Sequence, residues 1–351
     1  MTMAIKSAHA YQVNFVMQAG ISIVQLMISI ALGLLVLLIA MAMVVTTKVA
    51  FSLQTDLSDM QESSTFAMDN IARSLRQAGY LSYDISGTSQ LLSATASPDI
   101  IGLDASSLSA TTTDISTVLK STVNSSDVLA IRFFGAGNTK NGDGTILNCA
   151  GFSVPAPLSS ETADEDRGWS IYYVAENSNK EPELFCKYQS INSKSGNMSW
   201  SAQAIIKGVE SFQVLYGIDV PVSESRSIKR YLNANEINAM DAGLVLTGNT
   251  SIEKSADLNR KTFWKKVNEV RVAMLLSGEA GTRSDSLTTT YHLFGEAYAA
   301  IAGETDKGTS IKEIDLPLEK RNRLRKVYVT TVVLRNNCAV DPIHQTCLAP
   351  V

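Results

Sequence analysis

The chain has 351 residues, of which 45% are apolar and 18% charged, and 30 Lys and Arg against 34 Asp and Glu give a net charge of −4. This balance excludes a strongly basic nucleic-acid-binding protein as a description of the whole chain, because phosphate contacts need an excess of Lys and Arg. The mean hydropathy of +0.06 excludes a wholly disordered chain, which would contain too little apolar surface to fold.

The first predicted element is an apolar helix at residues 21–45. These 25 residues include no charged side chain and only three polar ones, Ser22, Gln25 and Ser29. As a helix the run extends roughly 37 Å, which is more than the hydrocarbon core of a bilayer. It lacks the polar stripe of a soluble surface helix, and it is too long for the apolar core of an ordinary cleaved secretory signal. We therefore predict that residues 21–45 span a membrane.

The junction before this run, Gly-Ile-Ser-Ile-Val-Gln-Leu-Met at residues 20–27, resembles the type IV prepilin signature. In that family a dedicated membrane peptidase, the prepilin peptidase, removes a leader that ends in Gly, and the new N-terminal residue is methylated. The resemblance implies a cleaved leader at residues 1–20, a cut between Gly20 and Ile21, and N-methylation of Ile21. Gln25 departs from the family pattern, which has a Glu there to neutralise the α-amine of a neighbouring subunit. An amide forms hydrogen bonds but supplies no charge.

The helical pattern continues through residues 46–80. Its apolar stripe consists of Leu53, Leu57, Met60, Phe66, Ile71, Leu75 and Ala78. Gly79 is a typical residue for the C-terminal end of a helix. Residues 70–80 also resemble the PilW family of minor pilins, and this resemblance makes residues 46–80 the periplasmic half of one long helix.

Residues 81–126 are rich in Ser and Thr, and we predict a mostly irregular surface connection with room for one short helix. Beyond it the pattern changes to that of strands. Strands are predicted at residues 127–134, 169–174, 184–188, 209–218, 267–276, 287–293 and 325–334. A long helix followed only by strands indicates an α+β fold, in which the helix packs on an antiparallel sheet.

Several of these segments resemble the PilW family in the same order along the chain. They include residues 208–219, 231–234, 270–272 and 326–336, together with Trp264. The resemblance covers most of the chain and implies a pilin fold with a PilW-like β-rich domain at residues 127–351. Residues 81–126 and 238–262 are then insertions.

All four cysteines, Cys149, Cys186, Cys338 and Cys347, follow the apolar run, which fits an oxidising compartment. Four cysteines allow three pairings. We favour Cys149–Cys186 and Cys338–Cys347, because each pair is closest in sequence. A zinc site is disfavoured because the short spacing typical of cysteine ligands is missing.

We interpret three polar segments as structural features rather than as binding sites. Residues 138–145 are predicted to form a turn rather than a calcium loop, because acidic ligands are missing at both ends. The acidic residues 164–166 are predicted to be a solvated loop. The basic run at residues 320–326 is the densest in the chain, and we interpret it as a charged strand entrance that contacts acidic groups. DNA binding is the weaker alternative for this run, because no aromatic side chains are interleaved.

No nucleophile motif, zinc-protease motif or phosphate-binding loop occurs in the sequence, so we expect neither an enzyme nor a cofactor or metal. The PilW resemblance implies a minor pilin that helps to initiate type IV pili at the tip, with a role in motility or adhesion. Implied partners are other minor pilins, the major pilin, a PilY-type tip adhesin, the prepilin peptidase and the inner-membrane assembly platform. The implied location is the inner membrane, with a periplasmic C-terminal domain, and the pilus tip at the cell surface.

Two alternatives remain open. One is a minor pseudopilin of a type II secretion system, and the other is an unprocessed, single-pass, membrane-anchored binding domain. We also hypothesise that Gln25 is tolerated because a subunit at the very tip has no subunit above it whose amine needs a carboxylate.

Overall fold

The computed structural model describes residues 20, 22–80, 92–119, 122–137, 142–157, 159, 162–191, 198–223, 226–281, 283, 288–302, 305–335, 339–340 and 347–348. The chain forms two compact units, Met1–Ser52 and Leu53–Val351. The helix α1 (Ile23–Gln77) continues from the first unit into the second. Its 55 residues confirm the predicted long helix, and Gly79, with a φ of +66°, ends it in the left-handed region.

Within the second unit, α1 buries only part of the apolar stripe that the sequence contains. Met60, Ile71 and Leu75 are buried. Leu57 and Phe66 are 39% and 56% exposed. Small side chains such as Ala67 take the inward positions instead, which lets the helix approach the strands closely.

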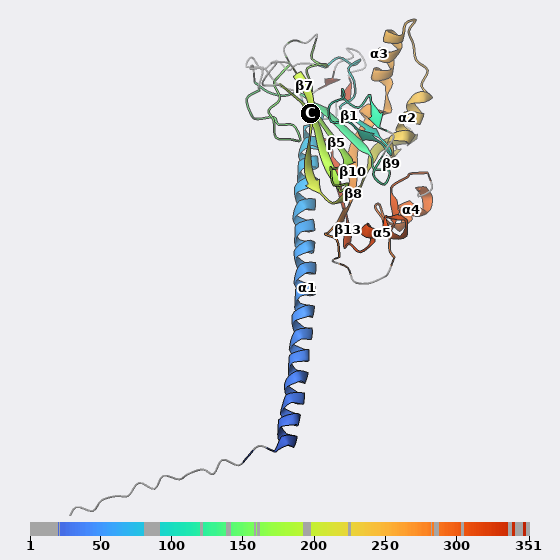
Figure 1. Ribbon diagram of the computed structural model, residues 1–351. Coiled ribbons are helices and arrows are strands. Elements are labelled where there is room, and N and C mark those ends of the chain that lie inside the picture. The colour runs from blue at the N-terminus through green and yellow to red at the C-terminus, as the bar shows by residue number, and fades with distance from the viewer. Residues whose placement is uncertain are drawn as a thin grey trace, which may run out of the picture. The chain divides into compact units, whose positions relative to one another are not determined.

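Two antiparallel sheets make up most of the second unit (Figure 1). The five-stranded sheet has the order β1 (Ile100–Leu103), β4 (Val128–Phe133), β5 (Gly168–Glu176), β6 (Pro182–Ile191) and β7 (Met198–Lys207). The four-stranded sheet has the order β13 (Arg325–Val333), β10 (Val267–Ser277), β8 (Val209–Ser223) and β9 (Arg226–Leu232). Most of the predicted strands are confirmed, whereas β1, β7 and β9 were not predicted.

Both sheets turn one face towards α1. Alternate residues of each strand point to the same face, and one buried cluster joins α1 to β4, β5, β8 and β10. Ile71 and Leu75 of α1 belong to this cluster together with Leu129, Val214 and Val272. The predicted α+β fold, with a helix packed on antiparallel sheet, is therefore confirmed.

Gly208 makes the corner at which the chain passes from one sheet to the other, between β7 and β8. Its φ is +75°, and a Cβ at this position would lie 2.6 Å from the carbonyl oxygen of Ser277. Its N–H donates to Pro182 O, and its carbonyl accepts from Ser277 N. Only glycine satisfies both this backbone conformation and this close approach.

The outer faces of the sheets are covered by segments between the strands. Leu108 of β2 (Ser107–Leu108), which pairs with β3 (Val118–Leu119), packs on β4 and β5. The prediction of a mostly irregular connection at residues 81–126 was therefore too simple, and its described part contains three short strands and no helix. Residues 81–91 and 120–121 lie outside the described part.

The expectation that only strands follow α1 was also wrong. The second unit contains α2 (Ala234–Ala242), α3 (Ser251–Lys261), α4 (Glu296–Ala302) and α5 (Leu318–Arg321), with the short helices η1 (Phe263–Lys266) and η2 (Glu313–Asp315). The short strand β11 (Thr290–His292) covers part of the predicted strand at 287–293 and pairs with β12 (Ser310–Lys312). Figure 1 shows α2 near β1 and β9 and α5 near β13. A last pair, β14 (Ala339–Val340) and β15 (Cys347–Leu348), follows β13 in the chain.

Candidate functional site

The predicted processing junction lies at the start of α1. Gly20 is exposed, whereas Ile21 lies outside the described residues. Ser22 and Gln25 contact backbone groups at the helix start: Val24 N donates to Ser22 Oγ at 3.4 Å, and Ser22 N donates to Gln25 Oε1 at 3.3 Å. The Gln25 amide thus accepts a hydrogen bond from its own helix terminus.

The apolar part of α1 presents its side chains outward on every side. From residue 22 to residue 50 each described side chain is exposed, including Ile23 at 76%, Leu35 at 55% and Leu38 at 69%. The helix contains an 18-residue window of mean hydropathy 3.0. By length and composition it can cross a membrane, so the chain's N-terminal part is consistent with membrane anchoring.

In the second unit, a polar link fixes α1 on the five-stranded sheet. The Tyr172 hydroxyl donates to Asn70 Oδ1 at 2.6 Å and lies 2.7 Å from Ser74 Oγ. The Asn70 amide donates to the carbonyl of Cys149 at 3.1 Å. Complete burial raises the pKa of Tyr172, so this side chain remains a neutral hydrogen-bond donor.

The structure contains the expected disulfide between Cys149 and Cys186, with a Cα–Cα distance of 5.9 Å. It joins the segment before β5 to β6 inside the main core. The pairing of Cys338 with Cys347 lies outside the described residues, because only the backbone of Cys347 is described. The backbone pairing of β14 with β15 sets Val340 opposite Cys347, and the second disulfide stays a prediction.

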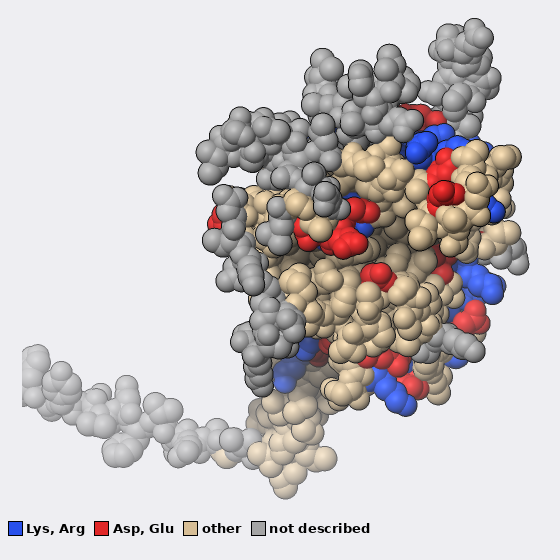
Figure 2. All heavy atoms as spheres, turned by 90° about the horizontal axis from the view of Figure 1, so that it is seen from above, with Lys and Arg blue, Asp and Glu red and all other residues tan. Residues whose placement is uncertain are grey.

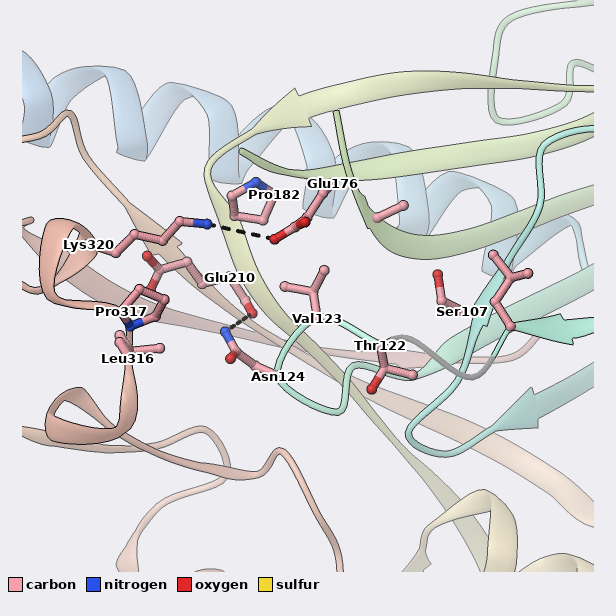
Figure 3. A pocket seen from close by; sticks show the side chains of 12 residues that line it. Ser107, Thr122, Val123, Asn124, Glu176, Pro182, Glu210, Leu316, Pro317 and Lys320 are labelled. Carbon is pink, nitrogen blue, oxygen red and sulfur yellow. Dashed lines mark hydrogen bonds and ion pairs between the residues drawn. The ribbon is translucent and has the colours of Figure 1, made fainter. Parts of the chain in front are cut away.

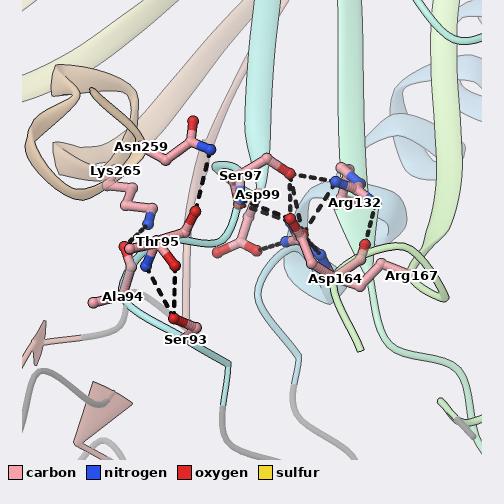
Figure 4. A network of polar contacts seen from close by, with 10 residues as sticks. All are labelled: Ser93, Ala94, Thr95, Ser97, Asp99, Arg132, Asp164, Arg167, Asn259 and Lys265. Atoms are coloured by element: carbon pink, nitrogen blue, oxygen red, sulfur yellow. Dashed lines mark hydrogen bonds and ion pairs between the residues drawn. The ribbon is translucent and has the colours of Figure 1, made fainter. Parts of the chain in front are cut away.

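A charged network joins the segments just before β1 and β5 to strand β4 of the five-stranded sheet (Figure 4). Arg167 and Arg132 both bind Asp164, and Arg167 also binds Asp99. Asp164 accepts further hydrogen bonds from the backbone and hydroxyl of Ser97. The solvated-loop prediction was therefore wrong for Asp164. Although burial acts in the opposite direction, Arg167 holds the pKa of Asp164 below its usual value.

The basic run at residues 320–326 is bound largely within the chain. Arg323 makes a bidentate contact with Glu181 at 2.7 and 2.8 Å, and Arg321 donates to the carbonyls of Leu316 and Ile314. The Nζ of Lys320 lies 3.8 Å from Glu176. The interpretation as a charged strand entrance that contacts acidic groups is therefore confirmed, and these groups lie at the end of β5 and just before β6 of the five-stranded sheet.

Arg325 is the most deeply buried member of the run. Its guanidinium is 0% exposed and contacts Glu210 at 2.6 Å and Glu313 at 2.9 Å, and both carboxylate side chains are 2% exposed. Arg283 binds Glu313 as well, at 2.8 Å. These contacts attach η2 to strands β8 and β13, which fixes the segment that covers the four-stranded sheet.

Two carboxylates organise the junction between β1, β4 and α2. Asp104 accepts from Ala234 N at 2.9 Å and Asn235 N at 2.7 Å, at the N-terminus of α2. Asp127 accepts from Ala105 N and Val214 N. Burial raises the pKa of Asp104 to about 6 and that of Asp127 well above its usual value. Their backbone contacts give both side chains a structural role.

A pocket of about 410 Å³ lies between the segment at residues 107–124 and the segment at residues 316–320 (Figure 3). Its wall combines the Lys320–Glu176 ion pair with the hydrogen bond that Asn124 donates to Glu210 O at 2.8 Å. The Ser107 hydroxyl is bound to Val174 O. The lining residues are Ser107, Leu119, Thr122, Val123, Asn124, Ala175, Glu176, Pro182, Glu210, Leu316, Pro317 and Lys320. Histidine and cysteine are missing from the lining residues that the structure describes.

The described residues hold no group of His, Cys, Asp and Glu suited to a metal ion. In the described part of residues 138–145, Asp143 accepts from the backbone and hydroxyl of Thr145, as in a polar turn. Figure 2 shows acidic and basic side chains interspersed on the face that it presents. His292 contacts Ser310 Oγ at 2.9 Å within the β11–β12 pair.

The sequence could not reveal which charged residues are buried together. Arg167 and Asp99 lie 68 residues apart, and Arg325 and Glu210 lie 115 apart. Charged residues are rarely buried without a partner, but nothing local in the sequence distinguishes these from solvated ones. Arg167, Glu210 and Arg325 lie in or beside predicted strands, whereas Asp99 does not.

Comparison with known proteins gives one family match. The model of the family PilW, type IV pilus-assembly protein W, matches residues 171–336, just under half of the chain. The matched range begins in β5 and ends just after β13, so it includes all of the four-stranded sheet. No curated protein matches the chain. The match supports a protein of the PilW family that is involved in type IV pilus assembly.

Proposed function

We propose that this protein is a minor pilin that helps to initiate type IV pili and resides at or near the pilus tip. It is made as a precursor, cut between Gly20 and Ile21, and held in the inner membrane by residues 21–45, with residues 46–351 in the periplasm. The observation that carries the proposal is the combination of a PilW-family sheet domain with an apolar helix whose side chains are exposed on all sides.

Assembly then consists of moving the apolar helix from lipid into a bundle of similar helices. Lipid tails are as apolar as Leu and Ile, so no hydrophobic gain drives this step, and close side-chain packing supplies the free energy. The partners are other minor pilins, the major pilin and a PilY-type tip adhesin. The protein needs no catalytic group or cofactor for this function.

The tip position is supported by the missing charge at Gln25. Its amide oxygen accepts from Ser22 N of the same helix, and it brings no charge that could neutralise the amine of another subunit. A subunit with no neighbour above it does not need that charge, because an unpaired buried charge then never arises. Gln25→Glu should therefore leave pilus number and the position of the protein unchanged. Cross-linking that places the protein along the shaft would contradict the tip assignment.

The mature N-terminus tests the precursor proposal. Mass spectrometry of the full chain purified from its native membrane should show a protein that begins at N-methylated Ile21. Gly20→Leu should keep the leader attached, whereas Gly33→Leu, inside the helix, should leave processing intact. A wild-type chain with its leader intact would exclude the pilin class and favour an unprocessed membrane-anchored domain.

Deletion of the protein separates a pilin from a pseudopilin. Loss of surface pili and of twitching motility, with normal enzyme secretion, supports the pilin. Loss of enzyme secretion with normal pili would contradict the proposal and favour a type II secretion pseudopilin.

A further inference from the structure

β13 is an edge strand of the four-stranded sheet, paired on one side with β10. In antiparallel pairing, alternate residues bond to the neighbouring strand and the others direct N–H and C=O away from it. Leu334 N donates to Asn268 O, and the register from Val333↔Glu269 to Arg325↔Ser277 is unbroken. The backbone N–H and C=O groups of the even-numbered residues of β13 therefore bond to β10. Those of the odd-numbered residues point away from β10, towards the open edge of the sheet.

The outward-facing backbone groups belong to Val327, Val329, Thr331 and Val333. No hydrogen bond within the described part of the chain reaches their N–H or C=O groups. Val329 and Val333 are 49% and 62% exposed, and Thr331 is exposed between them. From Val327 to its end at Val333 the strand has no charged residue, proline or glycine. As far as the described residues show, this edge offers unpaired backbone groups beside apolar side chains.

The other sheet edges carry features that oppose strand addition. β1 has only 4 residues and contacts α2. β9 contains Arg226, Lys229 and Arg230 among its 7 residues. The pairing of β6 with β7 has a register shift between Leu184 and Phe185. β13 has 9 residues in continuous register, and among these edges it alone combines length, regularity and a central uncharged run.

We propose that β13 accepts an extended, uncharged segment of another pilus subunit as a fifth strand of this sheet. A backbone in extended conformation is the partner whose N–H and C=O groups repeat at the spacing of the outward groups on β13. Small or β-branched side chains of that segment pack beside Val329 and Val333 on the exposed face. The identity of the partner as a pilus subunit rests on the proposed function.

Amide hydrogen exchange tests the added strand residue by residue. Full chain tagged and purified from cells that make pili, with its bound subunits, is compared with full chain produced alone in the same detergent. On its own, the chain should exchange the amides of Val327, Val329, Thr331 and Val333 rapidly. In the assembly these amides should slow by at least about tenfold, while those of Tyr328, Thr330 and Val332 are slow in both samples.

Two outcomes would overturn the proposal. Rapid exchange of the four outward amides in the assembly would mean that no strand is added. Slow exchange in the chain alone would mean that the chain itself already covers the edge.

A matched pair of variants adds a functional readout. Val329→Pro removes one outward N–H and leaves the β10 pairing intact, since proline is tolerated on an edge strand when its nitrogen faces outward. Val329→Thr keeps the N–H. Val329→Pro should reduce recovery of the bound pilus subunits at least about tenfold at unchanged thermal stability, and Val329→Thr should not. Equal recovery with both variants would refute the strand addition, whereas normal pili after deletion of the whole protein would refute the proposed function instead.

Discussion

The environment of Arg325 differs strongly from the environments of its neighbours in sequence. It belongs to a run of basic residues, yet its guanidinium is 0% exposed between Glu210 and Glu313. A buried ion pair is costly to form and still more costly to break, because the remaining charge has no solvent around it. Arg323, two residues away, forms its bidentate contact with a Glu181 side chain that is 38% exposed.

These two arginines give a matched prediction. Arg325→Met should lower the free energy of unfolding by about 3–5 kcal/mol, because Glu210 and Glu313 are left with less compensation. Arg323→Met should cost about 1 kcal/mol or less, because Glu181 can be solvated. Urea unfolding of the full chain in detergent, followed by tryptophan fluorescence, measures both. Adding Glu210→Gln to Arg325→Met should recover part of the loss; no recovery would contradict the buried-charge explanation.

Asp104 predicts a dependence of stability on pH. Burial, with Asp306 and Glu236 nearby, raises its pKa from 3.8 to about 6. Because the folded-state pKa lies above the unfolded-state pKa, protonation favours the folded state. The contribution of Asp104 to stability is therefore complete below the unfolded pKa and declines as the pH rises from about 4 to about 6.

On acidification from pH 7 to pH 5, the wild-type chain should gain stability relative to Asp104→Asn, by an amount on the order of 1 kcal/mol. Thermal unfolding at the two pH values measures this difference. Asp143→Asn is the control, because Asp143 is exposed and its pKa is already lowered by Thr145. An identical pH response of Asp104→Asn and wild type would contradict the assignment.

At the scale of elements, α1 has a buried stripe whose position the apolar residues alone did not define. Met60, Ala67, Ile71 and Leu75 face the sheets, whereas Leu57 and Phe66 do not. The sequence predicted the helix itself correctly, because its apolar run and its Gly79 terminus are local signals. Which apolar residue turns inward depends on the strands that pack against the helix, and these strands come from distant parts of the chain.

Two truncations on α1 should therefore have unequal effects. Ile71→Ala should lower the free energy of unfolding by about 2–5 kcal/mol, because it leaves a cavity in the main core. Phe66→Ala should change it by roughly 0.5 kcal/mol or less, because the ring is 56% exposed. Urea unfolding of the full chain measures both. Equal losses would mean that Phe66 is buried in the protein.

At the scale of the whole molecule, the two units have different surfaces. The described side chains from 22 to 50 are exposed and mostly apolar, while the unit from Leu53 onward has its own core held by the Cys149–Cys186 disulfide. An exposed apolar surface of this extent is unfavourable in water and favourable in lipid. In our proposal, the first unit therefore anchors the molecule in the membrane.

Leu35→Arg should test this role without touching the sheet domain. A charge at the centre of a spanning helix costs about 2.5–3.5 kcal/mol on insertion scales, so less of the protein should be recovered in the membrane fraction. Leu35→Met keeps an apolar side chain of similar size and should leave the distribution unchanged. Fractionation of cells with antibody detection measures both. Equal membrane recovery of the two variants would contradict anchoring by this segment.

The sequence by itself determined the long helix, most of the strands and the family resemblance, because apolar periodicity, glycine termini and β-branched runs are local properties. It also supported the Cys149–Cys186 pairing through proximity along the chain. Only the tertiary structure decided that Arg325, Arg167 and Asp164 are held in buried or partly buried networks, and that β13 ends a sheet with outward backbone groups. These features depend on contacts between residues far apart in the chain, and on the order in which strands pair, which no local pattern specifies.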